Sequence, residues 1–119
     1  MKVLIVENEL LIAIDLGMTV TELGHDVCGI ATSASDAIAQ AGAHKPDVIL
    51  MDIRLSDGSG IDAAREICAC HGMRCIFLTA NLDGATQAAL SACGPIAFLG
   101  KPFLPFALKR ALEMAKEKC

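Results

Sequence analysis

The chain contains no tryptophan and no tyrosine, and aromatic residues make up only 3% of its 119 residues. Its core must therefore be built from aliphatic side chains, which dominate the 54% of residues that are hydrophobic. Domains that bind nucleic acids are usually basic, and many stack bases on aromatic rings. This chain has 10 basic and 14 acidic residues and a formal net charge of −4. We therefore expect no direct binding to DNA.

The sequence also has no apolar run of the roughly 20 residues that a membrane-spanning helix needs. Met1 and Lys2 lead directly into the apolar segment Val3–Val6, without the small-residue cleavage site of a secretory signal. Linkers, internal repeats and low-complexity tracts are absent too. These features predict a single cytoplasmic domain over residues 1–119, without a membrane segment and without an output domain.

The chain has enough cysteine to raise the question of disulfides or a metal site. The six cysteines are Cys28, Cys68, Cys70, Cys75, Cys93 and Cys119. Most lie in apolar segments of a chain that can bury its own core, which favours reduced, packed thiols. The cluster of Cys68, Cys70, His71 and Cys75 lacks the two-residue spacing and the second ligand pair of a zinc site, so a structural metal is disfavoured there.

Strand and helix signals alternate five times along the chain. The predicted strands are Lys2–Val6, Asp26–Ala31, Val48–Asp52, Cys75–Thr79 and Ile96–Leu99. The predicted helices are Leu10–Leu23, one from Ser33 or Ser35 to about Ala43, Ile61–Cys70, Asp83–Cys93, and one from Pro105 to about Lys116, with a loop over Ile53–Gly60. Five βα units with short connections predict an α/β fold: a doubly wound parallel sheet with helices on both faces.

Three residues mark features of the first predicted helix. Gly24 follows the helix in the position where glycine commonly ends one. Gly17 lies inside it, where glycine lowers stability but permits close packing against a sheet. Glu9 is expected in the first turn, where negative charge is favoured.

Polar residues follow four of the predicted strands at the point where each strand ends. They are Glu7, Asn8, Asp52, Thr79 and Lys101. In an open α/β sheet these positions share the carboxyl edge, where ligands bind. Each residue alone has an ordinary interpretation, such as the capping of a turn by Asp52. Together, a cluster of carboxylates, a hydroxyl and a cation at one edge of the sheet predict a functional site.

The motifs at these positions resemble those of the receiver domain of two-component response regulators. They are Glu7-Asn8, the Asp52 segment Met-Asp-Ile-Arg-Leu-Ser-Asp-Gly-Ser-Gly, Thr79-Ala80 and Lys101-Pro102-Phe103. The resemblance covers the whole chain, with these four separated motifs in the same order. It implies a flavodoxin-like (βα)5 fold with the strand order 2-1-3-4-5. Flavodoxin itself is disfavoured, because no Ser/Thr-Gly-rich phosphate loop follows the first strand.

The resemblance also implies a phosphoacceptor site. Asp52 is expected to accept a phosphoryl group from a sensor histidine kinase or a phosphotransfer protein, and the domain to catalyse its own phosphorylation and dephosphorylation. Lys101 and Thr79 are expected to contact phosphoryl oxygens. Mg²⁺ is expected to be held by Glu7, Asn8, Asp52 and the main-chain carbonyl of Arg54.

The resemblance further implies a switch, in which Thr79 moves toward the phosphoryl group and Phe98 turns inward. The surface expected to change is formed by the fourth predicted helix, the fifth predicted strand and the fifth predicted helix, over Asp83–Lys116. It is expected to act on a downstream protein partner, unless the domain serves as a phosphate sink.

One departure from the family pattern leaves a second hypothesis open. Asn8 stands where the family usually has an acid, so the site loses one negative charge and its affinity for Mg²⁺ is expected to fall. The favoured reading is still a phosphorylatable switch, since Asp52, Thr79 and Lys101 are all present. The alternative is an atypical receiver that binds a protein independently of phosphorylation.

Overall fold

The computed structural model describes residues 1–55, 58–59, 62–63, 65–67, 74–79, 84, 88, 95–101 and 104–117. The strands are β1 (Lys2–Val6), β2 (Asp26–Ala31), β3 (Val48–Asp52), β4 (Arg54–Leu55), β5 (Gly58–Ser59), β6 (Cys75–Thr79) and β7 (Ala97–Gly100). The helices are α1 (Leu10–Glu22), α2 (Ala34–His44) and α5 (Pro105–Glu117). Residues 62–63, 65–67, 84 and 88 are also helical.

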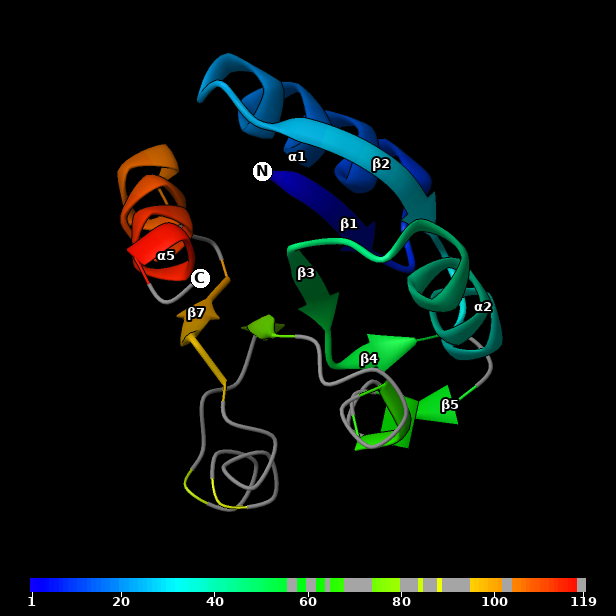
Figure 1. Cartoon of the computed structure of the whole chain (residues 1–119). Helices are drawn as coiled ribbons and strands as arrows, with labels where there is room; N and C mark the ends of the chain where they lie inside the picture. The colour runs from blue at the N-terminus through cyan, green and yellow to red at the C-terminus, as the bar shows by residue number, and fades with distance from the viewer. Residues whose placement is uncertain are drawn as a thin grey trace.

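The five longer strands form one parallel sheet with the order β2-β1-β3-β6-β7. This is the predicted order 2-1-3-4-5, and the predicted doubly wound α/β fold is confirmed. Figure 1 shows α1 and α5 on one face of the sheet, and α2 with the helical residues 62–63 and 65–67 on the other. Helices on both faces are what a parallel sheet requires, because its βα crossovers place them there.

The middle of the sheet forms the core. Every residue of β3 and β6 is buried, as are the last four residues of β1. Alternate side chains enter two separate apolar clusters, one under α1 and α5 and the other under α2. These strands therefore read as continuous apolar runs, as expected for strands buried on both faces.

The ends of the helices settle two points that the sequence left open. Ser33, and not Ser35, is the N-cap of α2, because its hydroxyl accepts a hydrogen bond from the Asp36 amide at 3.1 Å. Glu9 is the N-cap residue of α1, so the prediction that it lies in the first turn is wrong. Gly24 follows α1 with φ of +90°, a conformation that suits glycine and ends the helix as predicted.

The predicted loop over Ile53–Gly60 is not entirely irregular. Arg54 pairs with Ser59, and Leu55 pairs with Gly58, in a small antiparallel ladder. Strands of two residues are too short to show an alternating pattern, so the sequence carried no signal for them. The predicted helices at 61–70 and 83–93 lie only partly within the described residues, and those described are helical.

The described helices share one further property: none combines the length and the apolar character needed to cross a membrane.

Two glycines allow a matched test of packing. A Cβ atom at Gly17 would lie 3.6 Å from Ile5 Cδ1 and 3.8 Å from Val27 Cγ2, which are ordinary contacts. A Cβ atom at Gly29 would collide with the side chain of Gln40. That side chain donates hydrogen bonds to the Ile30 carbonyl and to Asp36 at 3.0 and 2.9 Å, so moving it has a cost.

We predict that Gly17→Ala raises the free energy of unfolding by about 0.5–1 kcal/mol, because alanine favours a helix interior and its methyl group fits. Gly29→Ala is expected to lower it by about 1 kcal/mol, because Gln40 must give up its hydrogen bonds. Urea denaturation of both variants checks this. A destabilising effect of Gly17→Ala would contradict the packing described for α1.

Candidate functional site

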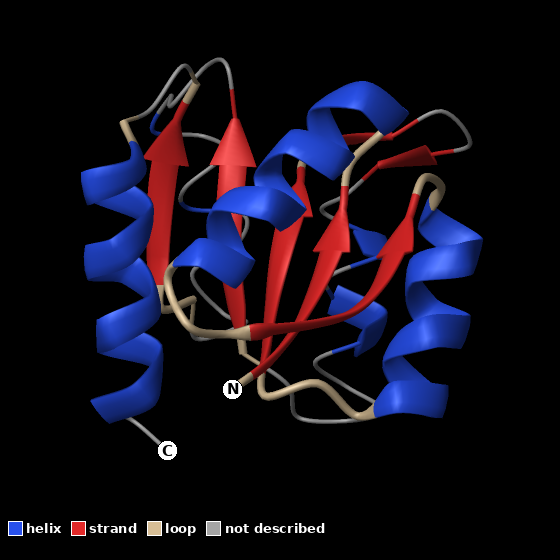
Figure 2. Cartoon of the chain, turned by 90° about the horizontal axis from the view of Figure 1, so that it is seen from above, coloured by secondary structure: helices blue, strands red, loops and turns tan. Residues whose placement is uncertain are grey.

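Lys101, Glu7 and Asp52 meet at the carboxyl edge of the sheet. The ammonium Nζ of Lys101 lies 2.8 Å from Glu7 Oε2 and 3.1 Å from Asp52 Oδ2, and it donates a hydrogen bond to each. Figure 2 shows why residues so far apart in sequence meet: all five strands of the sheet end at the same edge. Glu7 follows β1, Asp52 ends β3, and Lys101 follows β7.

Main-chain hydrogen bonds continue the sheet just beyond the strand ends and hold these residues in place. The Glu7 amide donates to the Ala31 carbonyl at 3.0 Å, and the Lys101 amide donates to the Thr79 carbonyl at 2.7 Å. Asp52 is itself the last paired residue of β3, opposite Leu78 of β6. Each functional side chain therefore starts from a backbone position that the sheet holds rigidly.

The charged groups are largely removed from water. Glu7 is only 2% exposed and Asp52 7%. Burial raises the pKa of Glu7, and the nearby charge of Asp52 raises it further, while the hydrogen bond from Lys101 lowers it. Burial alone would lower the pKa of Lys101, but its hydrogen bonds to Glu7 and Asp52 outweigh this and raise it. Lys101 is thus a firmly protonated cation beside two carboxyl groups.

The other predicted residues lie at the same edge in different environments. Thr79 is buried at the end of β6. Asn8 follows Glu7 directly, and its side chain is exposed. Arg54 is the first residue of β4 and follows Asp52 by two positions in the chain.

Two contacts were not predicted from the sequence. The first is the ion pair of Lys101 with Glu7; the presence of opposite charges after β1 and β7 could have indicated it. The second is the hydrogen bond from the Glu9 amide to Glu7 Oε1 at 3.3 Å, which depends on the turn into α1. Both contacts restrain the Glu7 carboxylate.

Phe98, the predicted aromatic switch residue, lies on β7 opposite Phe77 of β6. The two rings stack with centroids 5.6 Å apart and an interplanar angle of 27°. Phe98 is partly buried and packs against the cluster that contains Phe77. Aromatic pairs at this separation stabilise the side of the sheet that they cover.

The donor set of this edge suits a small hard cation. The carboxylates of Glu7 and Asp52 already converge on one positive charge, and Mg²⁺ prefers carboxylate, carbonyl and water oxygens. Among the residues that the structure describes, no group of three or more His, Cys, Asp and Glu side chains could hold a metal. Two acids, completed by carbonyl or amide oxygens and water, are sufficient for Mg²⁺, which keeps several waters.

The cysteine cluster can be followed only at one of its members. Cys75 is buried at the start of β6 and Cys28 lies in β2, and neither forms a disulfide with another described residue. Burial raises the pKa of Cys28. Cys68, Cys70 and His71 lie outside the described residues.

Comparisons with known proteins agree with this geometry. The family model described as the response regulator receiver domain matches residues 3–113. The transcriptional regulatory protein PdtaR of Mycobacterium tuberculosis is 36% identical over 114 residues, which cover 96% of this chain and 56% of that protein. The chemotaxis protein CheY of Thermotoga maritima is 30% identical over 123 residues, covering 94% of each chain.

A solved structure also resembles this fold closely. The signal receiver domain of a modulated diguanylate cyclase from Desulfovibrio desulfuricans superposes with a TM-score of 0.89 at 33% identity, over 98% of this chain and 94% of that one. The chain spans little more than half the length of PdtaR, so the comparison with PdtaR concerns one region of that protein.

The site predicts a pH-dependent contribution of Lys101 to stability. At pH 7, Lys101→Met leaves two neighbouring carboxylates without their cation. We expect the free energy of unfolding to fall by about 1–3 kcal/mol, less than for a fully buried pair because the site lies at the edge of the sheet. Chemical denaturation at several pH values measures this.

The sign of the pH effect follows from the raised pKa of Glu7. The folded protein takes up this proton at a higher pH than the unfolded chain does, so stability increases as the pH falls through the folded-state pKa. In Lys101→Met the free energy of unfolding is expected to start rising at a higher pH, because the pKa of Glu7 is no longer lowered by the hydrogen bond from Lys101. The difference in stability between the variant and the wild type should therefore be smaller near pH 5 than at pH 7. Lys109→Met, on the exposed surface of α5, is the control and should change little. Equal losses at pH 5 and pH 7 would contradict the expectation.

Proposed function

This chain belongs to the response regulator receiver domain family, and from that premise we propose that it is a signalling switch phosphorylated on Asp52 by a histidine kinase. Receiver domains interact with histidine kinases and with downstream targets. The observation that carries the proposal is the contact of Lys101 with both Glu7 and Asp52 at the carboxyl edge. It brings an acceptor carboxylate, a second acid and a fixed cation into one small volume.

The proposed reaction is a phosphoryl transfer between protein side chains. A carboxylate oxygen of Asp52 attacks the phosphorus atom of a phosphohistidine on the kinase. The new O–P bond forms as the P–N bond breaks, and the electron pair leaves with the histidine imidazole. Negative charge is then shared among the three equatorial phosphoryl oxygens. Hydrolysis of the aspartyl phosphate by water returns the carboxylate and releases inorganic phosphate.

Lys101 and Thr79 would stabilise the transferred group. The ammonium group of Lys101 already lies 3.1 Å from Asp52 Oδ2, so a phosphoryl oxygen attached there would come within its reach. Thr79 ends the neighbouring strand, and its hydroxyl is the donor proposed for a second phosphoryl oxygen. Both groups stand at backbone positions set by the sheet, so little reorganisation is needed when charge develops.

Magnesium is the cofactor proposed for this site, since receiver domains generally bind it for phosphorylation. Its ligands would be Glu7, Asp52, the main-chain carbonyl of Arg54 and the side-chain oxygen of Asn8. When bound, the ion would neutralise charge on the phosphoryl oxygens. In the structure Lys101 pairs with the carboxylates of Glu7 and Asp52. After phosphorylation of Asp52 it would pair with the phosphoryl group instead.

Asn8 is expected to weaken this metal site without abolishing it. An amide oxygen can still coordinate, but it carries no charge, whereas Glu7 and Asp52 each carry one. Asn8 follows Glu7 directly in the chain, and its side-chain oxygen is the group proposed to coordinate the ion, directly or through water. The same residue favours the second candidate function, a receiver that binds its partner regardless of phosphorylation.

The output of the switch is proposed to pass through β7 and its neighbours. Thr79 and Gly100 are paired across β6 and β7, and Phe98 lies two residues before Gly100 on β7. A movement of Thr79 toward a phosphoryl group would therefore disturb the packing of Phe98 on Phe77. The proposed partner surface is the segment 83–116, made of the predicted helix at 83–93 with β7 and α5, and the structure describes only part of it.

The first test uses acetyl phosphate as the phosphoryl donor and intact mass as the readout. We expect wild-type protein to gain one phosphoryl group in the presence of Mg²⁺, and the Asp52→Asn variant to gain none. The change from carboxylate to amide removes the nucleophile while keeping the size of the side chain. An adduct of equal yield on Asp52→Asn would place the acceptor elsewhere.

A histidine kinase donor separates the two candidate functions. No adduct from acetyl phosphate or from a histidine kinase at any Mg²⁺ concentration would favour the phosphorylation-independent module, as would a partner that binds Asp52→Asn and wild type equally.

The second test concerns the cost of Asn8. We expect Asn8→Asp to lower the Mg²⁺ concentration for half-maximal effect about tenfold, which corresponds to about 1.4 kcal/mol, because a charged ligand replaces a neutral one. A Mg²⁺ titration of the melting temperature measures this without any phosphoryl donor. Ala43→Asp, in the last turn of α2, adds the same charge away from the site and controls for net charge. An unchanged titration would show that residue 8 does not contribute to the metal site.

A further inference from the structure

The outer surface of α1 is apolar although it faces solvent. Leu11 is 82% exposed, Met18 59% and Ile14 44%, and their spacing of three and four residues places them on one stripe. Leu10 extends this α1 stripe at 56% exposed. Single exposed apolar residues are ordinary, but a continuous stripe of four along a helix indicates an interaction surface.

The charges beside the α1 stripe are all of one sign. Within α1, Asp15 and Glu22 are exposed and there is no Lys, Arg or His. A partner that covers this stripe should therefore present apolar side chains together with basic ones.

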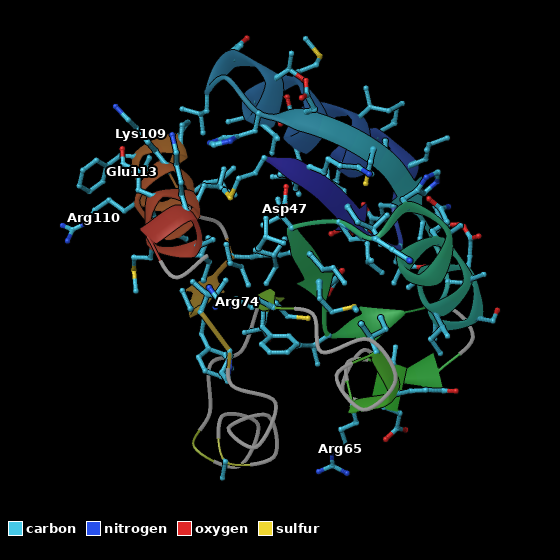
Figure 3. All side chains as sticks on the ribbon, in the orientation of Figure 1. Asp47, Arg65, Arg74, Lys109, Arg110 and Glu113 are labelled. Atoms are coloured by element: carbon cyan, nitrogen blue, oxygen red, sulfur yellow. The ribbon has the colours of Figure 1, made fainter. Side chains whose placement is uncertain are left out.

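Helix α5 has this combination. Phe106 is 64% exposed and Met114 39%, so α5 carries apolar groups on its outer side too. Lys109, Arg110 and Lys116 are also exposed. Figure 3 shows Lys109, Arg110 and Glu113 pointing outward from α5, away from the sheet. Among the described side chains the salt bridges are those of Lys101 with Glu7 and Asp52, and these three bases of α5 make none.

The two helices lie on the same face of the sheet. Ala13 and Val20 of α1 enter the same apolar cluster as Leu108 and Leu112 of α5, and Figure 1 shows both helices on that face, α1 near β1 and β2 and α5 near β7. One molecule therefore offers a composite surface with an acidic apolar half on α1 and an apolar half on α5 that is mainly basic, with three exposed bases and one exposed acid, Glu113, among its described side chains. Such a surface is complementary to itself.

We propose that a second copy of this chain occupies this face, in a two-fold symmetric dimer that packs α1 of each protomer against α5 of its partner. In a two-fold interface the same patch is used twice, so the α1–α5 contact would be made twice. The two-fold axis would run between the helices and along them. An axis across the helices would instead place α1 against α1 and bring like charges together.

The spacing of the charges agrees with this arrangement. Both helices have 13 residues and both run back from the carboxyl edge, so in the proposed dimer α1 and the partner's α5 run parallel. Asp15 is the sixth residue of α1, and Arg110 is the sixth of α5. Glu22 and Lys116 are the thirteenth and twelfth. In the proposed dimer Asp15 thus lies level with Arg110, and Glu22 with Lys116. The two acids are seven residues apart on α1, and the two bases are six residues apart on α5.

The size of the surface sets the strength to expect. Helices of this length are about 20 Å long and pack about 10 Å apart, so two of them cover on the order of 400 Å² per protomer. Specific interfaces usually bury about 800 Å² per partner, so this contact is at the small end. We expect a reversible dimer that forms at tens of micromolar or above. The proposal is independent of phosphorylation.

The test uses reciprocal charge swaps in the full chain. One variant carries Asp15→Lys and Glu22→Lys, and the other carries Arg110→Glu and Lys116→Glu. By sedimentation equilibrium from about 10 μM to 1 mM, wild type should pass from monomer to dimer, while each variant alone should associate at least tenfold more weakly. An equimolar mixture should recover association, because each α1 then meets an α5 of opposite charge.

Several outcomes would overturn the proposal. Wild type that stays monomeric at 1 mM shows that a second copy does not occupy this face. A dimer that persists in both swapped variants uses a different surface. A mixture that fails to associate shows that α1 does not meet α5. Circular dichroism confirms that each variant is folded, and the acetyl phosphate adduct, measured on the same samples, reports separately on the function of Asp52.

Discussion

The functional edge depends on the two salt bridges that the ammonium group of Lys101 forms with Glu7 and Asp52. The ammonium group contacts Glu7 at 2.8 Å and Asp52 at 3.1 Å, and so joins the ends of β1, β3 and β7. Two carboxyl groups this close and this buried would repel each other without a cation between them. The site is thus held together by electrostatic attraction at the carboxyl edge, where the apolar strands end.

This arrangement requires the sheet beneath it. Because β3 and β6 are wholly buried and β1 nearly so, the strands cannot slide without exposing apolar side chains. The register then fixes how far each strand end projects, and a shift of one residue would turn Asp52 to the other face. Rigid strands with charged ends are well suited to chemistry that relies on preorganised charges.

The two faces of the molecule contribute differently. The face under α2 holds the stacked pair of Phe77 and Phe98, which lies next to the functional edge. On the other face, α1 and α5 seal the core with small and aliphatic side chains, and direct further apolar groups outward. Because α1 begins three residues after Glu7, and α5 begins four after Lys101, both helices start at the edge where the charges meet.

The sequence alone determined the α/β class, the order of the sheet and the identity of the residues at its carboxyl edge. Those depend on continuous apolar runs, on helix-ending glycines and on motifs, all of which are local. The ion pair of Lys101 with Glu7, the choice of Ser33 as a cap and the short β4–β5 ladder appeared only in the structure. Each depends on which atoms come within hydrogen-bonding distance once the chain is folded. Only the tertiary structure decides that, because such distances follow from packing and not from residue type.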